Sequence, residues 1–276
     1  MKLNLNAVWS RAVELVRDNF SLLVVIAGVF LLLPTITTYL LIPDVATLLD
    51  PAADPEVLAA QISEFVGPLI GVGFLAMIFQ FAGYGAMVSL MGEGRPTVGQ
   101  AIGNGFKMVP SLFVIMILFL IMYLVGALVI MVPISLLAAL ANAPALSFLA
   151  VILIFVFVLY LMTRLSLSMP ALALEGSLNP FTAIGRSFKL TSSNQWRILL
   201  FWLVLGVLYF IIALLFTGIF GVIAALFSTG MVASLILGLV NGAMGMIVGM
   251  LLCAIAVAMY GQLSGPGADE IEQTFE

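Results

Sequence analysis

Residues 175–197 read EGSLNPFTAIGRSFKLTSSNQWR, the most polar run of its length between long apolar segments. Asn179 followed by Pro180 indicates the start of a helix. The asparagine side chain can accept a hydrogen bond from a backbone N–H of the first turn, which has no partner within the helix. Proline is favoured at the first helical position, where a backbone N–H would have no helical partner in any case. Apolar residues then recur at spacings of three and four, so that Phe181, Ile184 and Phe188 lie on one face of the helix. The pattern predicts a short amphipathic helix that lies on a membrane surface before the chain turns into the bilayer.

The composition indicates an integral membrane protein. Of the 276 residues, 64% are hydrophobic and 8% are charged, whereas roughly a quarter of the residues of a soluble domain are charged. The chain has no histidine and one cysteine, Cys253, which excludes a disulfide framework within one chain and a histidine-based metal site. We expect no metal, no cofactor and no nucleic-acid partner.

Six apolar segments are long enough to cross a bilayer, since about twenty helical residues span its hydrocarbon core. We predict an all-α protein with spans at about 21–42, 65–91, 110–132, 147–174, 198–226 and 232–263. The first span is preceded by an amphipathic helix at 6–20 and is expected to bend near Pro34. The loop 43–64 carries only acidic charges; a solvated loop is the favoured interpretation and a calcium site the alternative.

An internal repeat organises these spans. AIGNGFKM at 101–108 matches AIGRSFKL at 183–190 at five of the aligned positions without a gap, and residues 8–11 fit the same frame more weakly. Thr97 and Gln100 form a capping box at the start of the second copy. The spacing suits a surface helix followed by two membrane spans. We predict three such units, at about 1–95, 96–178 and 179–264, within a single six-helix membrane domain.

The cations set the orientation, because loops on the cytoplasmic side carry the excess of lysine and arginine. With six spans, all nine cations fall on one side of the membrane. Both termini are therefore expected in the cytoplasm, and the three units share one topology around an axis along the membrane normal. The acidic tail at 265–276 is expected to be disordered.

A cluster of charged and aromatic residues follows the fourth span and is the candidate site. Its members are Arg164, Glu175, Arg186, Lys189, Trp196 and Arg197. One interpretation is structural: Glu175 forms an ion pair with Arg164, Arg186 or Arg197, close to an interruption of the helix at Pro170. The alternative is a phosphate or lipid-headgroup site that uses these cations and a helix N-terminus.

Polar and small residues within the spans suggest contacts between helices. Gln80 is costly to expose to lipid and should face another helix, and Asn241 is expected to bond to another helix or to line a pathway. Close approach of a neighbouring backbone is predicted at Gly238, Gly242, Gly245 and Gly249. Packing within the monomer is the favoured interpretation and a dimer contact the alternative.

The pattern R…P…LEG…PF.AI.RSF.LT…WR resembles the membrane domain that some bacterial glycerophosphoryl diester phosphodiesterases carry ahead of their catalytic domain, and which also occurs alone. The matching residues are Arg164, Pro170, Glu175, Ser187, Leu190, Thr191, Trp196 and Arg197. The resemblance implies a multi-pass protein of the bacterial cytoplasmic (inner) membrane. It does not imply the esterase activity, which requires a soluble barrel with histidine.

Two classes of function follow. The first is a non-enzymatic scaffold, or a module that binds lipid or a membrane or cytoplasmic protein partner at the cytoplasmic face. The second is a small transporter or lipid-translocating protein, against which stands the scarcity of polar groups in mid-membrane. An enzyme is not expected, since neither a histidine base nor a pair of carboxylates within a span is present.

Overall fold

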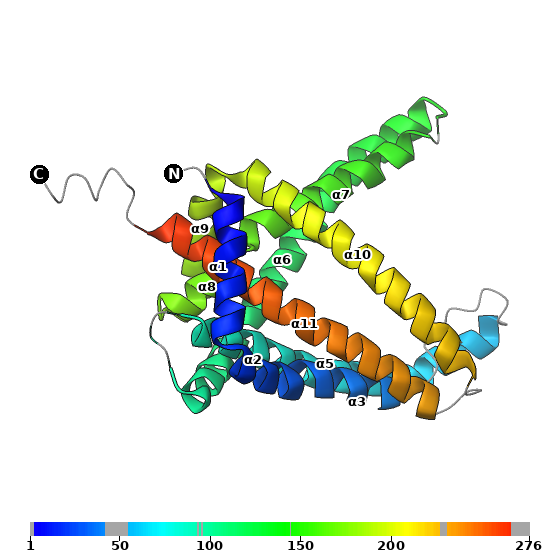
Figure 1. The fold of residues 1–276 in the computed structure, drawn as a ribbon. Helices are drawn as coiled ribbons and strands as arrows, with labels where there is room; N and C mark the ends of the chain where they lie inside the picture. Colours follow the sequence, from blue (N-terminus) through cyan, green and yellow to red (C-terminus); the bar gives the residue numbers. More distant parts are fainter. Residues whose placement is uncertain are drawn as a thin grey trace, which may run out of the picture. The chain divides into compact units, whose positions relative to one another are not determined.

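The computed structural model describes residues 3–41, 55–92, 94, 96–143, 145–226 and 231–265. Helices make up nearly all of this part of the chain (Figure 1). In order they are α1 Leu5–Asp18, α2 Phe20–Ala27, the π-helix η1 Gly28–Leu32, α3 Leu33–Leu41, α5 Pro55–Leu90, α6 Val98–Leu140, α7 Leu146–Leu165, α8 Ser168–Leu174, α9 Pro180–Ser192, α10 Gln195–Leu226 and α11 Met231–Ser264. Three parts of the chain lie outside the described residues: residues 43–54 of the predicted acidic loop, the turn at Ser228-Thr229 and the tail after residue 265.

Six helical stretches in the described part are long and apolar enough to cross a membrane, as the sequence predicts. They are Phe20–Leu41, Ile70–Leu90, Val98–Leu140, Leu146–Leu174, Gln195–Ala224 and Met231–Ser264. The all-α class is confirmed, and the number of apolar helices agrees with the six predicted spans.

Two predicted boundaries at the start of a span do not occur. α5 begins at Pro55, within the predicted loop 43–64, and continues without a break to Leu90, so no boundary lies near residue 65. α6 begins with the predicted capping box, in which the Thr97 N–H donates to Gln100 Oε1 at 2.9 Å, and then runs through Pro110 to Leu140. The segment 109–112 is Val-Pro-Ser-Leu and packs Val109 and Leu112 inward. It therefore lacks the polar turn TSSN that separates α9 from α10.

A π-helical distortion lies close to Pro34, where the sequence predicts a bend. The π-helix η1, Gly28–Leu32, ends two residues before Pro34, whose missing N–H and bulky ring disturb the preceding turn. The hydroxyl of Thr35 donates to the Leu31 carbonyl at 2.8 Å, which helps to satisfy the backbone of that turn.

Pro170 interrupts the fourth apolar stretch, also as predicted. α7 ends at Leu165 and α8 begins at Ser168, two residues before the proline. Proline has no N–H, so Pro170 cannot donate the helical hydrogen bond to the Ser166 carbonyl four residues earlier. The regular helical hydrogen bonding is interrupted there. The break is a fixed feature of the candidate site.

The chain forms two compact units. Unit 1 draws on Met1–Ala12, Pro110–Val207 and Ile255–Glu276, and unit 2 on Val13–Val109 and Leu208–Ala254. Within unit 2, α5 contacts α2, η1 and α3, and its aromatic cluster joins Phe30, Phe79 and Phe106 with ring centroids 5.8–6.3 Å apart.

Three of the four predicted contact glycines of α11 pack within unit 2. A Cβ at Gly238 would lie 3.1 Å from Tyr39 Cβ, and one at Gly242 or Gly249 would lie 2.7 Å from the methyl group of Leu32 or Leu31, respectively. Around Gly245 a Cβ would meet nothing within 4 Å. Three of these glycines therefore contact other helices of the same chain, and Gly245 has no such contact among the described residues.

Candidate functional site

The polar segment, residues 164–197, is built as its local sequence dictates. Asn179 caps α9, because its side chain accepts a bond from the Phe181 N–H at 3.0 Å with Pro180 as the first helical residue. α9 packs on α7 and α8 through small side chains: Ala183, Ser187 and Thr191 are buried. Phe181, on the predicted apolar face, is 65% exposed, so that face is available to lipid.

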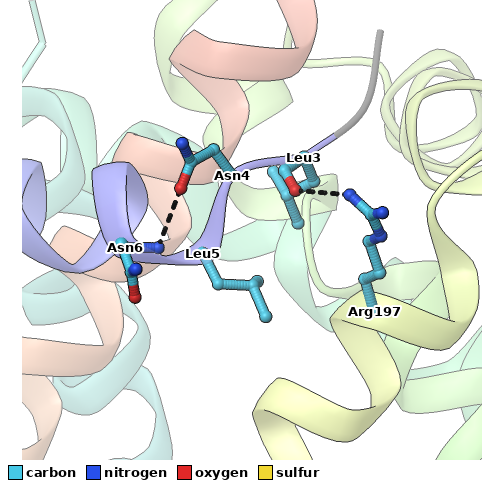
Figure 2. Close-up of a pocket in the computed structure, with 5 residues that line it drawn as sticks. All are labelled: Leu3, Asn4, Leu5, Asn6 and Arg197. Carbon is cyan, nitrogen blue, oxygen red and sulfur yellow. Dashed lines mark hydrogen bonds between the residues drawn. The ribbon is translucent and has the colours of Figure 1, made fainter.

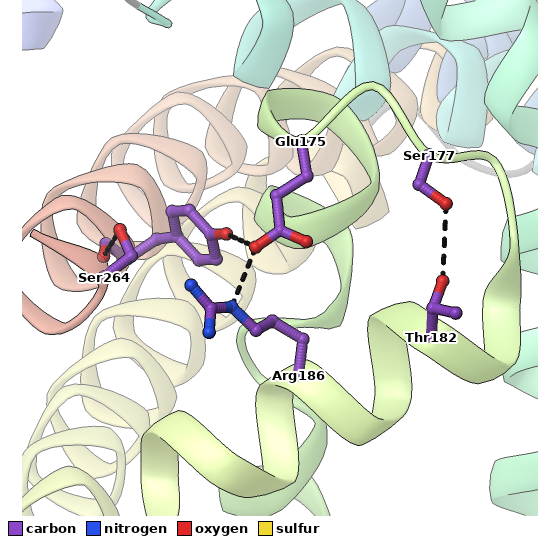
Figure 3. A network of polar contacts seen from close by, with 6 residues as sticks. Glu175, Ser177, Thr182, Arg186 and Ser264 are labelled. Atoms are coloured by element: carbon purple, nitrogen blue, oxygen red, sulfur yellow. Dashed lines mark hydrogen bonds and ion pairs between the residues drawn. The ribbon is translucent and has the colours of Figure 1, made fainter.

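Glu175 pairs with Arg186, one of the three arginines predicted as alternatives. The Arg186 Nε lies 2.8 Å from Glu175 Oε1, and Figure 3 shows the two side chains pointing toward one another. The hydroxyl of Tyr260, near the end of α11, donates to the same carboxylate oxygen. Tyr260 was not predicted as part of the cluster. The available signal was its position near the end of the final apolar segment, where interfacial aromatic residues concentrate.

The surroundings of Arg186 favour its charged form. Hydrogen bonding to Tyr260 and to Glu175 raises the pKa of Arg186 above its ordinary value, while desolvation opposes this. Because the guanidinium is already engaged, Arg186 contributes to holding α8, α9 and α11 together in unit 1. This contact corresponds to the structural interpretation of the cluster.

Arg164, another of the three alternative partners, forms no ion pair with Glu175 in the described part of the chain. Its Nη1 donates to Thr191 Oγ1 at 3.1 Å, and its guanidinium carbon lies 4.6 Å from the centroid of the Phe188 ring. A cation over an aromatic face is attracted by the ring electrons. Arg164 therefore ties the end of α7 to α9.

Ser187, whose role was not predicted from the sequence, bridges the break between α7 and α8. Its hydroxyl donates to the Arg164 carbonyl at 2.6 Å and accepts a bond from the Leu167 N–H at 3.2 Å. Both are backbone groups that the interrupted helix leaves without their usual partners. The only signal in the sequence was a small polar residue four positions from Ala183 and from Thr191, on one helix face.

Replacing Ser187 by alanine should destabilise unit 1 by about 1–3 kcal/mol, because two buried backbone groups lose their partner. Thermal unfolding of the purified protein in detergent should show an apparent Tm several degrees lower. Ser192→Ala is the matched control, since that exposed hydroxyl bonds only to the Lys189 carbonyl of its own helix. Equal stability of the two variants would contradict the bridging role.

Arg197 holds the N-terminal segment. Its Nη1 donates to the Leu3 carbonyl at 3.0 Å, and the Leu3 N–H donates to Asn194 Oδ1 at 2.9 Å. A recess of about 480 Å³ opens beside these groups (Figure 2). It is lined by Leu3, Asn4, Leu5, Asn6 and Arg197, so one arginine and two amide side chains meet two leucines there.

Lys189 and Trp196 are not drawn into these contacts. Both side chains are exposed, Trp196 by 68%. No hydrogen bond or ion pair of the Lys189 ammonium group occurs within the described part of the chain. Of the six candidate residues, the structure thus joins Glu175 to Arg186, gives Arg164 and Arg197 separate partners, and leaves Lys189 and Trp196 facing outward.

Asn241 differs from the favoured expectation. Its Nδ2 donates to the Leu237 carbonyl at 2.9 Å, a bond within its own helix, and it forms no hydrogen bond to another helix among the described residues. A helical amide can satisfy itself in this way on the carbonyl one turn earlier. Gln80 is half-buried in α5.

Among the described residues, no three side chains of histidine, cysteine, aspartate and glutamate come together as metal ligands. Comparison with known protein families, with curated proteins and with solved structures found no match to this chain.

Proposed function

We propose that this chain is a non-enzymatic multi-pass membrane protein that binds anionic lipid headgroups, and through them organises partners, at its cytoplasmic face. The observation that carries the proposal is the recess beside Arg197. Its volume of about 480 Å³ falls within the range of ligand sites, and its one arginine and two asparagines offer a positive charge and amide groups to an anionic headgroup. Trp196, exposed next to Arg197, is suited to the headgroup level of a bilayer.

The proposed topology has both termini in the cytoplasm of a bacterium and three repeated units. Equivalent burial supports the repeat: Val8, Ala101 and Ala183, which align with one another, are all buried. Four positions further on, Ala12 and Ser187 are buried as well, and Gly105 packs against the backbone of α5. Small residues at this position let each amphipathic helix approach its neighbour.

We also propose a relation to the stand-alone form of the phosphodiesterase membrane domain. Several residues that carry the resemblance contact one another: Ser187 bonds to the Arg164 backbone and Thr191 to the Arg164 side chain. A shared pattern of residues that interact is a stronger argument for relation than composition, which apolar helices share in general.

Retention of lipid tests the function. Native mass spectrometry of the protein purified in detergent should show phosphatidylglycerol retained in preference to phosphatidylcholine. Because a cation near an anionic surface is worth about 1 kcal/mol, Arg197→Gln should reduce the retained phosphatidylglycerol by about fivefold.

Arg17→Gln is the control, since it removes the same charge from an exposed position on α1 outside the recess. Equal loss in both variants would assign the preference to overall charge instead of the recess. No preference in the wild type would reject lipid binding and leave the scaffold and transporter hypotheses to be tested by partner capture and uptake assays.

A further inference from the structure

The charge of Arg164 is not neutralised by any group that the structure describes. No carboxylate oxygen in the described residues lies within 4 Å of its guanidinium, and Glu175 is engaged by Arg186 and Tyr260. A guanidinium has five N–H donors; one of them bonds to Thr191, and the buried Nε has no partner. A cation withdrawn from water is normally paired, because its desolvation is costly.

A second unsatisfied group lies one turn further along the chain. The hydroxyl of Ser168 is buried and has no hydrogen-bond partner among the described residues, and Ser168 is 2% exposed. A helical serine often donates to the carbonyl four residues earlier, which here belongs to Arg164. That carbonyl already accepts the 2.6 Å bond from Ser187. The break between α7 and α8 is thus flanked by two residues whose side chains retain unused donors.

We propose that Arg164, at the end of α7, binds a phosphate group through its unused guanidinium donors. The inference rests on the proposed function and adds a second, internal site to the recess at Arg197. Phosphate suits these donors, because a guanidinium fork binds two of its oxygens and supplies the opposite charge. Arg164 is only partly buried, so a ligand from the membrane surface can reach it.

The phosphate comes from a lipid headgroup or from the free ion, and two assays separate these sources. Native mass spectrometry with added dioleoylphosphatidylglycerol, compared with dioleoylglycerol, which lacks phosphate, tests the lipid. Isothermal titration with inorganic phosphate tests the free ion. Arg164→Gln should weaken the binding of the phosphate-bearing species by roughly tenfold or more. Ser168→Ala should leave it unchanged, because Ser168 is 2% exposed and a ligand at the surface does not reach its hydroxyl.

Arg164→Lys separates binding from folding. Lysine keeps the charge and its attraction to Phe188 but lacks the planar fork, so this variant should fold like the wild type and still bind phosphate several-fold more weakly. Unchanged binding in folded Arg164→Gln and Arg164→Lys would overturn the site. If Arg197→Gln reduces lipid retention while the Arg164 variants do not, only the internal site fails; if the wild type binds neither probe, both proposals fail.

Discussion

Replacing Gly105 by alanine is expected to prevent stable folding of unit 2 or to lower its stability by about 3 kcal/mol or more. A Cβ at this position would overlap the Ala82 carbonyl oxygen and lie 2.8 Å from the Ala86 amide nitrogen. Both atoms belong to the backbone of α5, which cannot rotate away as a side chain can. Fluorescence-detected size-exclusion chromatography after heating should show loss of the monodisperse peak at a much lower temperature.

Gly103→Ala is the matched control, two residues earlier on α6. A Cβ there would meet nothing within 4 Å, and alanine favours a helix over glycine by up to about 1 kcal/mol. This variant should be as stable as the wild type or slightly more so. If Gly105→Ala behaved in the same way, the close approach of α6 to α5 would be wrong.

Gly242→Leu is expected to have the second-largest effect, lowering stability by about 1–3 kcal/mol or more. The added Cβ alone would lie 2.7 Å from the Leu32 methyl group and 3.2 Å from the Leu32 carbonyl oxygen, and the rest of the leucine side chain must fit the same gap. Gly245→Leu is the matched control on the same helix, because a Cβ at position 245 would meet nothing within 4 Å. It should leave the monomer stable in the same thermal assay.

The pair also tests the alternative of a dimer contact. If α11 served mainly to join two copies, Gly245→Leu would change the oligomeric mass by light scattering while Gly242→Leu had little effect on stability. The monomer packing predicts the opposite ranking. A thermal shift for Gly245→Leu as large as that for Gly242→Leu would contradict the geometry around Gly242.

Much of the secondary structure follows from short-range sequence. The start of α9 at Asn179-Pro180, the capping box at Thr97 and the distortion before Pro34 each depend on residues within one turn. The six apolar stretches depend only on length and composition. Where a local signal was absent, as at Pro110, the predicted helix boundary was wrong.

The contacts of the candidate site follow from the sequence only in part. The sequence indicated that Glu175 would meet an arginine and that Arg164 lay near a helix break. It did not single out Arg186 as the partner or include Tyr260, 85 residues away along the chain. The sequence did not reveal the role of Ser187, because its partners are two backbone groups at the break between α7 and α8.

Residue order alone determined that this chain forms apolar helices of membrane length and where several of them begin, because caps, prolines and hydrophobic runs act within a few residues. Tertiary structure alone decided which arginine faces Glu175, which glycines meet a neighbour and which donors stay unused. These contacts depend on distances between segments that are far apart along the chain. Whether a glycine touches its neighbour is decided by a difference in helix separation of about the size of one methyl group.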